Sequence, residues 1–221
     1  MMEYPRFYKR NLPHWQPEGV SFHVVYRLFG TLPRKSLIEI QEKRDRILDD
    51  YIKLERTLYE KFPDGVPPEM IAELYFEKRL IHEEFFDQIE NLLDKAIYGP
   101  TWLQQANVAE IVRDSLHFME SQMKSCEILA YCIMPNHVHL IIREIQPVLH
   151  VVMKSHKQFT ARQANVLLGR TGNYFWQKES YDHIIRNEEE LEHHILYVLN
   201  NPVKAGLVTH WEDWPYTYLK Q

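Results

Sequence analysis

Two histidines near the middle of the chain stand at a spacing that suits metal binding. His137 and His139 are separated by one residue and follow directly after Pro135-Asn136, a pair typical of a tight turn. On a β-strand, residues i and i+2 point to the same face, so the two imidazoles would lie side by side. Such a pair offers two adjacent ligands to a divalent metal. Taken alone, the pair is also typical of ordinary surface or core histidines.

A tyrosine and an asparagine lie four residues apart in the last predicted helix. Tyr197 and Asn201 occupy positions i and i+4, about one turn apart on one helical face. A carboxamide oxygen can be the third ligand of an oxygen-preferring ion such as Mg²⁺ or Mn²⁺, and a phenol on the same face could be held beside that ion. Taken alone, Tyr197 is typical of a core or interface aromatic, and Asn201 of a residue at the C-terminal end of a helix.

The charge is unevenly distributed along the chain. The 221 residues include 26 basic and 31 acidic side chains, a net charge of −5 that by itself argues against a nucleic-acid binder. Residues 31–100 account for the whole excess, with 11 basic and 16 acidic side chains. Residues 147–186, by contrast, carry six basic side chains against two acidic ones. Because charges act over only about 8 Å at physiological salt, this segment can attract phosphates, or it can be a solvated helix face.

The apolar pattern predicts the elements that must position these groups. Strands are predicted at 20–29, 126–134, 137–145 and 174–185, and helices at 107–120, 148–168 and 188–201, the last stopped by Pro202. An acidic helical hairpin is predicted at 34–95.

Apart from this hairpin, the order is β-α-β-β-α-β plus a C-terminal helix. The predicted fold class is therefore α+β: a ferredoxin-like split βαβ antiparallel sheet with helices on one face, an inserted helical hairpin and a C-terminal helix. Residues 1–33 and 96–221 would form one domain, and 34–95 the insertion.

Other features favour a cytoplasmic protein. No apolar run approaches the roughly 20 residues that span a bilayer, and the first residues lack the apolar core of a signal peptide. The two cysteines, Cys126 and Cys132, lie in one strand-like segment, which excludes a disulfide framework.

Four segments carry a resemblance to a known family: AYCIMPNHVHLII, MKSHKQFTARQAN, FWQKESYDHIIRNEEELE and YVLNNPVKAGLV. Together they resemble the single-tyrosine transposase superfamily, and most closely the REP-associated tyrosine transposases, domesticated relatives of insertion-sequence transposases. The resemblance covers about 100–215, and residues 11–16 and 20–29 resemble the N-terminal part of many members. The hairpin at 34–95 is not part of the minimal family core.

The resemblance implies a role for each matching residue. His137 and His139 match the metal ligands of the family's His-hydrophobic-His motif, Tyr197 matches its nucleophile, and Asn201 the position that supplies a third ligand as Gln or Asn. Asn200, which lies off the Tyr197 face, is the alternative third ligand. The implied activity is Mg²⁺- or Mn²⁺-dependent cleavage and rejoining of single-stranded or hairpin DNA through a 5′-phosphotyrosine, by a monomer or a homodimer.

Substrate recognition would depend on the basic segment. Its basic side chains would contact phosphates, and the aromatic residues at 174–176 could stack on bases or pack in a strand. The expected DNA contacts are Lys154, Lys157, Arg162, Arg170, Trp176 and Arg186.

Three further histidines lie close to these segments. His183 lies in a recurrent family segment and would approach the metal site or order the last helix. His193 and His194, just before Tyr197, are expected to be solvent-facing or packing residues.

Three other functions have to be compared with this one. A metal-dependent phosphodiesterase using water would leave no protein–DNA adduct and would not need Tyr197. A regulatory DNA-binding protein with little catalysis would bind without cleaving. A zinc protein is a third reading, but two histidines and a carboxamide form a poor zinc shell.

Overall fold

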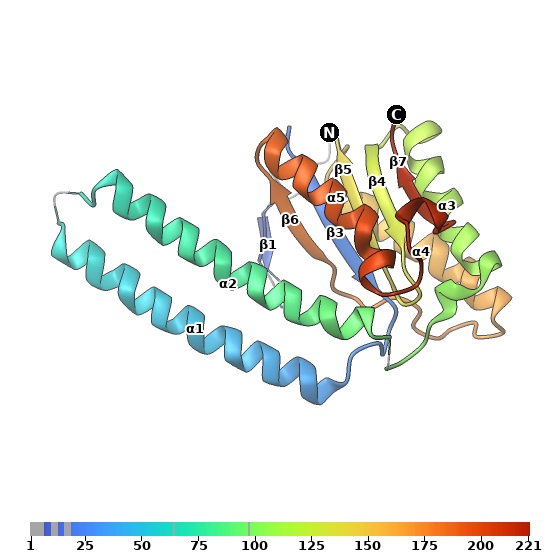
Figure 1. Cartoon of the computed structure of the whole chain (residues 1–221), viewed down its shortest axis with the longest axis horizontal. Helices are drawn as coiled ribbons and strands as arrows, with labels where there is room; N and C mark the ends of the chain where they lie inside the picture. The colour runs from blue at the N-terminus through green and yellow to red at the C-terminus, as the bar shows by residue number, and fades with distance from the viewer. Residues whose placement is uncertain (1–6, 10–12, 16–18, 64, 97) are drawn as a thin grey trace. The chain divides into compact units, whose positions relative to one another are not determined.

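The computed structural model describes residues 7–9, 13–15, 19–63, 65–96 and 98–221, which divide into two units. The first comprises the residues up to Thr31 together with Gly99–Gln221, and the second is Leu32–Tyr98 (Figure 1). None of the described helices is long and apolar enough to cross a membrane.

A five-stranded antiparallel sheet forms the centre of the first unit. Its strands are β3 (Ser21–Arg27), β4 (Glu127–Ile133), β5 (His137–Arg143), β6 (Tyr181–Ile185) and β7 (Thr217–Leu219). They are arranged in the order β6-β3-β5-β4-β7, so the first four strands along the chain have the split βαβ order and β7 extends one edge. The predicted fold class is confirmed.

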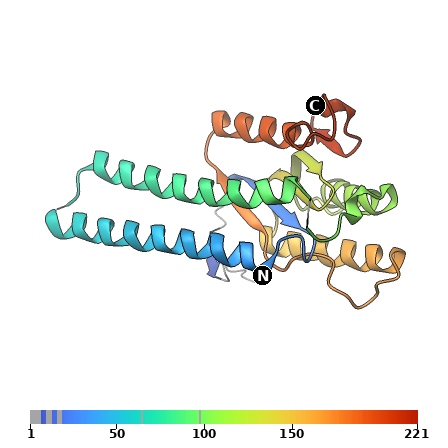
Figure 2. The same ribbon diagram turned by 60° about the horizontal axis from the view of Figure 1, so that its bottom comes forward.

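Helices cover both faces of this sheet. α3 (Ala106–Ser121) and α4 (Leu149–Leu167) pack on one face, and α5 (Glu188–Lys204) lies on the other (Figure 2). Short 3₁₀ turns precede α3 at Trp102–Gln104 and β7 at Trp211–Asp213.

The alternation of residues along β5 separates the two layers. Val138, Leu140 and Ile142 are fully buried in the main core with α3 and α4, whereas Ile141 packs in a smaller cluster with residues of α5. Because side chains alternate along a strand, the odd-numbered residues of β5 face α5. His137 and His139 therefore lie on the α5 side.

The remaining elements lie outside this sheet. In the second unit, α1 (Arg34–Lys61) and α2 (Pro68–Asp94) form a helical hairpin, with Lys43 Nζ 2.9 Å from Glu84 Oε1. In the first unit, β1 (Phe7–Lys9) pairs with β2 (Pro13–Trp15) in a separate two-stranded ribbon. The rest of the 11–16 segment lies outside the described residues.

Two predicted elements need correction. The strand expected at 174–185 is formed only by Tyr181–Ile185; the earlier part is irregular and joins the sheet by one bridge between Leu28 and Trp176. Pro202 does not stop the last helix, which continues to Lys204. A proline in the last turn removes one hydrogen bond without breaking the turns before it.

The last helix ends instead at a glycine. Gly206 has φ of +70°, and the Leu207 amide donates to the Pro202 carbonyl at 2.9 Å. This is the hydrogen bond of a Schellman motif, in which a left-handed residue closes the helix.

Gly99 stands where the chain returns to the first unit, and we expect its replacement to be costly. It has φ of +73°, and a Cβ there would collide with the Gly30 carbonyl and come within 2.7 Å of the Thr31 Cα. Gly99→Ala should lower the free energy of unfolding by about 3 kcal/mol, from left-handed strain and overpacking together. Urea denaturation measures this change.

Gly169 provides the matched control for this substitution. It has φ of +64°, but a Cβ there would meet nothing within 4 Å. Gly169→Ala should therefore cost only the conformational part, about 1 kcal/mol. Equal losses in the two variants would contradict the close approach of Gly99 to Gly30.

Candidate active site

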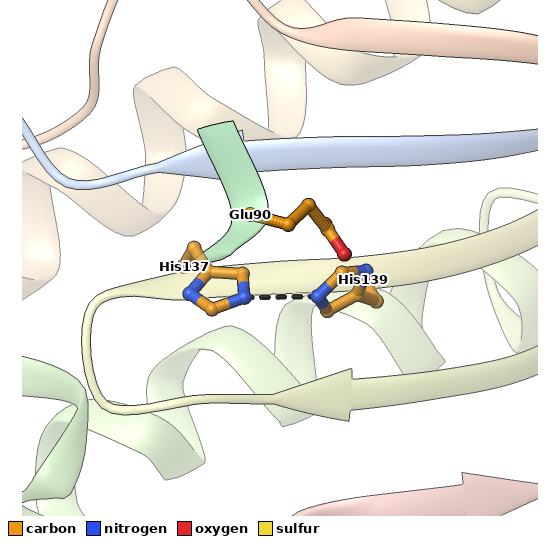
Figure 3. Close-up of side chains that lie close together, drawn as sticks. All are labelled: Glu90, His137 and His139. Atoms are coloured by element: carbon orange, nitrogen blue, oxygen red, sulfur yellow. Dashed lines mark hydrogen bonds between the residues drawn. The ribbon is translucent and has the colours of Figure 1, made fainter. Parts of the chain in front are cut away.

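The two histidines of β5 meet through the nitrogen atoms that could bind a metal. His137 Nε2 and His139 Nε2 lie 2.9 Å apart (Figure 3). When two metal–nitrogen bonds of about 2.1 Å meet at a right angle, the two nitrogen atoms are about 3.0 Å apart. The two Nε2 atoms therefore have the separation of adjacent metal ligands.

The surroundings of these histidines favour their neutral form. Burial, with the nearby charges of Lys204 and Arg27, lowers the pKa of His137 to about 3. Burial also holds the pKa of His139 well below its usual range, with His137 adding to the effect. His137 Nδ1 lies 2.6 Å from Asn136 Oδ1, an acceptor, which places the proton on Nδ1 and leaves the Nε2 lone pair available. Neutral imidazole is the form that binds metals.

Tyr197 lies beside this pair within a single chain. Its ring centroid is 6.0 Å from that of His139, and the Lys204 ammonium lies 5.3 Å from the centre of its ring. The helical geometry places Tyr197 on the face of α5 that meets the sheet, next to the buried Val198 and Leu199. The phenol is thus brought to the histidines without a second copy of the chain.

Asn201 lies one turn further along α5, where its side-chain amide is buried. Its side chain is 1% exposed, and its Nδ2 donates to the Tyr197 carbonyl at 2.9 Å. Among the described residues, none donates a hydrogen bond to its Oδ1. A buried carbonyl oxygen without a donor costs about 1–3 kcal/mol, and a cation would remove that cost. The donor set of His137, His139 and Asn201 therefore fits a divalent ion.

His23 belongs to this site and was missed from the sequence. It is fully buried on β3, with Nε2 3.1 Å from His139 Nδ1 and Nδ1 3.2 Å from His194 Nδ1. Its ring also lies 6.0 Å from that of Tyr197. In the sheet, Val25 pairs with His139, so His23 is the diagonal neighbour of that ligand. The proximity of His23 to His139 follows from the register of β3 against β5, which the sequence alone does not reveal.

We expect His23 to act as a positioning residue for His139. Partners of metal-bound histidines fix the tautomer and ring orientation, and their loss commonly weakens metal binding by about 10–100-fold. His23→Ala should weaken Mn²⁺ binding by that factor in calorimetry, and His23→Gln should restore part of the affinity. The His117→Ala control removes a histidine bonded to Tyr131 on the opposite face. An unchanged Mn²⁺ affinity in His23→Ala would contradict the assignment.

The predicted DNA contacts do not gather around this site. Lys154 and Arg162 are exposed on α4, which covers the other face of the sheet, and Arg186 is exposed just before α5. The Lys157 ammonium donates to the carbonyls of Gln177 and Lys178 and to the Ser180 hydroxyl, so it ties the 177–180 loop to α4. The Arg170 guanidinium lies 4.3 Å from the centre of the Trp102 ring.

The expectation that Trp176 stacks on a base is not supported by its position. The side chain is buried, its Nε1 donates to Thr160 Oγ1 at 2.9 Å, and its ring packs against Tyr26. Tyr174, two residues earlier, is 74% exposed and is the aromatic side chain open to solvent here. A cavity of about 460 Å³ lies beside it, between α4 and residues 173–180, with Lys154 and Lys178 in its lining.

Comparison with known proteins shows which class of protein this chain resembles. Residues 97–201 match the family model described as IS200-like transposase. A REP-associated tyrosine transposase homologue from Haemophilus influenzae is 32% identical over 103 residues, covering 41% of this chain and 57% of its own. A REP-associated tyrosine transposase from Escherichia coli is 30% identical over 95 residues, covering 41% and 53%. The chain spans about half the length of these curated relatives.

A solved structure extends the similarity of fold. The structure of a REP-associated tyrosine transposase bound to a REP hairpin aligns with a TM-score of 0.50 at 17% identity, covering 98% of this chain and 82% of the other. Residues 97–201 are thus similar to IS200-like transposases. The predicted resemblance to the REP-associated tyrosine transposases is confirmed.

Proposed function

We propose that this protein is a metal-dependent single-stranded DNA transesterase that cleaves near hairpin or repeat DNA. The observation that carries the proposal is the meeting of Tyr197 with the His137/His139 pair in one chain. A nucleophile and a pair of metal-ligand nitrogens at one point are what phosphodiester transfer requires.

The chain's own residues account for the reaction. Tyr197 Oη attacks the scissile phosphorus, forming the Oη–P bond as the P–O3′ bond breaks; the phenolic proton is lost and the 3′ oxygen leaves as a hydroxyl after taking up a proton. The Lys204 ammonium, 5.3 Å from the centre of the Tyr197 ring, brings a positive charge close to the attacking phenol. Held by His137, His139 and Asn201, Mg²⁺ or Mn²⁺ would supply Lewis-acid polarisation of the scissile phosphate.

The product would be a 5′-phosphotyrosine and a free 3′-hydroxyl. Because the covalent link keeps the bond energy, the 3′-hydroxyl of a second strand can reverse the attack without ATP. Since Tyr197 and the histidine pair come from one chain, a monomer would be sufficient for this chemistry.

Hairpin DNA is the proposed partner, because the similar solved structure is bound to a REP hairpin. The exposed side chains of Lys154, Arg162 and Arg186 are the proposed phosphate contacts, and Tyr174 is the proposed stacking residue. Binding should weaken as salt rises, because it depends on local positive charge in an acidic chain. Because the proposed substrate is DNA, the proposed location of the protein is the cytoplasm.

A labelled single strand carrying a hairpin tests the proposal. With Mn²⁺, we expect a denaturation-resistant protein–DNA adduct that carries the label when the strand is labelled at its 3′ end, and that protease digestion removes. With a 5′ label, we expect a free fragment that ends in a 3′-hydroxyl. Cleavage that yields a free 5′-phosphate without any adduct would instead indicate a phosphodiesterase using water. Hairpin binding with no cleavage in Mg²⁺ or Mn²⁺ would indicate a regulatory DNA-binding protein.

A further inference from the structure

A second group of metal-ligand side chains lies where β6 meets α5. It consists of His183, Glu190 and His194, and one ligand atom from each lies within 4.8 Å of the other two. His183 Nε2 is 2.9 Å from Glu190 Oε1, and the rings of His183 and His194 have centroids 4.7 Å apart. The His183 and Glu190 side chains are only 13% and 15% exposed.

The local fold brings these three residues together. β6 pairs with β3 so that His183 lies opposite His23, on the face of the sheet that α5 covers. Glu190 and His194 are at positions i and i+4 of α5, and so project from one helical face. The Asn187 side chain caps the helix by accepting from the Glu190 amide at 2.8 Å, which fixes the first turn against the end of β6.

The chemistry of the group suits a divalent transition metal. Two imidazoles and one carboxylate form a recurrent ligand set for zinc, manganese and iron. Glu190 Oε2 accepts from the Arg186 amide at 2.8 Å, and Oε1 faces His183 Nε2 at 2.9 Å and the Arg186 guanidinium at 3.3 Å.

We propose that His183, Glu190 and His194 form a second divalent-metal site, separate from the His137/His139 pair. Bonds of about 2.1 Å would require the ligand atoms to lie about 3.0–3.5 Å apart, a small contraction of the present group. His194 Nδ1 already lies 3.2 Å from His23, so its Nε2 is the ligand atom.

An ion at this position would join β6 to the helix that carries Tyr197. His194 precedes Tyr197 by three residues, about one turn of α5. His23 contacts both His194 and His139. A single imidazole would therefore separate the second metal site from the first. The ion would therefore hold the tyrosine helix against the sheet, a role beyond the DNA chemistry proposed above.

Metal titration of the whole 221-residue chain tests this site. A chain that carries both His137→Ala and His139→Ala lacks the first site. Treatment with EDTA removes any bound metal before the titration. We expect it to bind one equivalent of Zn²⁺ by calorimetry, to give visible absorption bands with Co²⁺, and to unfold at a higher temperature with Zn²⁺ present. Absence of Zn²⁺ binding in this variant, with its circular dichroism unchanged, would overturn the proposal.

Added substitutions show which residues hold the ion. Glu190→Gln keeps an acceptor for the Arg186 amide, so folding should be retained while Zn²⁺ affinity falls by about 100-fold or more. His194→Ala should do the same, whereas His193→Ala, an exposed neighbour on the same helix, should leave Zn²⁺ binding unchanged. Zn²⁺ affinity that falls in His193→Ala but not in Glu190→Gln would also overturn the proposal.

Discussion

Tyr197→Phe is expected to abolish the protein–DNA adduct and to reduce DNA cleavage by about 10⁴-fold or more, as removal of a nucleophile commonly does. The substitution deletes one oxygen and keeps the ring, which packs edge-on against His23 and His139 at 6.0 Å. The fold, the histidine pair and hairpin binding should therefore be unaffected. The measurement is gel separation of labelled DNA after incubation with Mn²⁺, with hairpin affinity measured in parallel.

Tyr75→Phe is the matched control for this result. Tyr75 is 65% exposed on α2 in the second unit, and its hydroxyl has no role in the proposed chemistry. Adduct formation should proceed at the parent rate in this variant. An adduct that persists in Tyr197→Phe would show that a different side chain attacks the phosphate.

The elements with clear periodicity could be predicted from the sequence. β5 follows a turn and alternates between His137, His139 and the apolar Val138 and Leu140, so its two faces were readable without the structure. The order of elements then permitted few topologies, and the split βαβ order was among them. Residues within one element, such as Tyr197 and Asn201, were also placed correctly on one helix.

Contacts that depend on strand register could not be predicted. His23 and His183 are 160 residues apart and become neighbours only because β3 pairs with β6 in one register. His194, expected to be a solvent-facing or packing residue, joins them because α5 lies over that part of the sheet. Register reflects the burial of both faces of the folded sheet, which no single segment specifies.

The aromatic segment 174–176 misled for a related reason. Aromatic residues in a row are typical of a strand or of a base-stacking surface. Here Trp176 is buried because its ring packs on Tyr26 and its indole N–H finds the Thr160 hydroxyl on α4. Tyr174 stays exposed. Tertiary packing thus divided one aromatic segment between the core and the surface.

Replacing His137 and His139 together by alanine is expected to remove DNA cleavage while preserving much of the DNA binding. Several kcal/mol of transition-state stabilisation depend on the ion that this pair would hold, so the cleavage rate should fall by about 10³-fold or more. EDTA should have the same effect on the unaltered chain. Hairpin affinity should change little, because the exposed Lys154, Arg162 and Arg186 lie outside the pair.

Two controls separate loss of the ligands from loss of the fold. Both histidines are fully buried, so His137→Gln with His139→Gln, which fills more of the same space, should also lack cleavage and should keep the circular dichroism of the parent. His117→Ala, which removes a histidine on the opposite face, should cleave at the parent rate. Cleavage that survives both EDTA and the loss of the pair would mean that Tyr197 attacks without a metal ion. Loss of hairpin binding in the glutamine variant would mean instead that the pair contacts DNA directly.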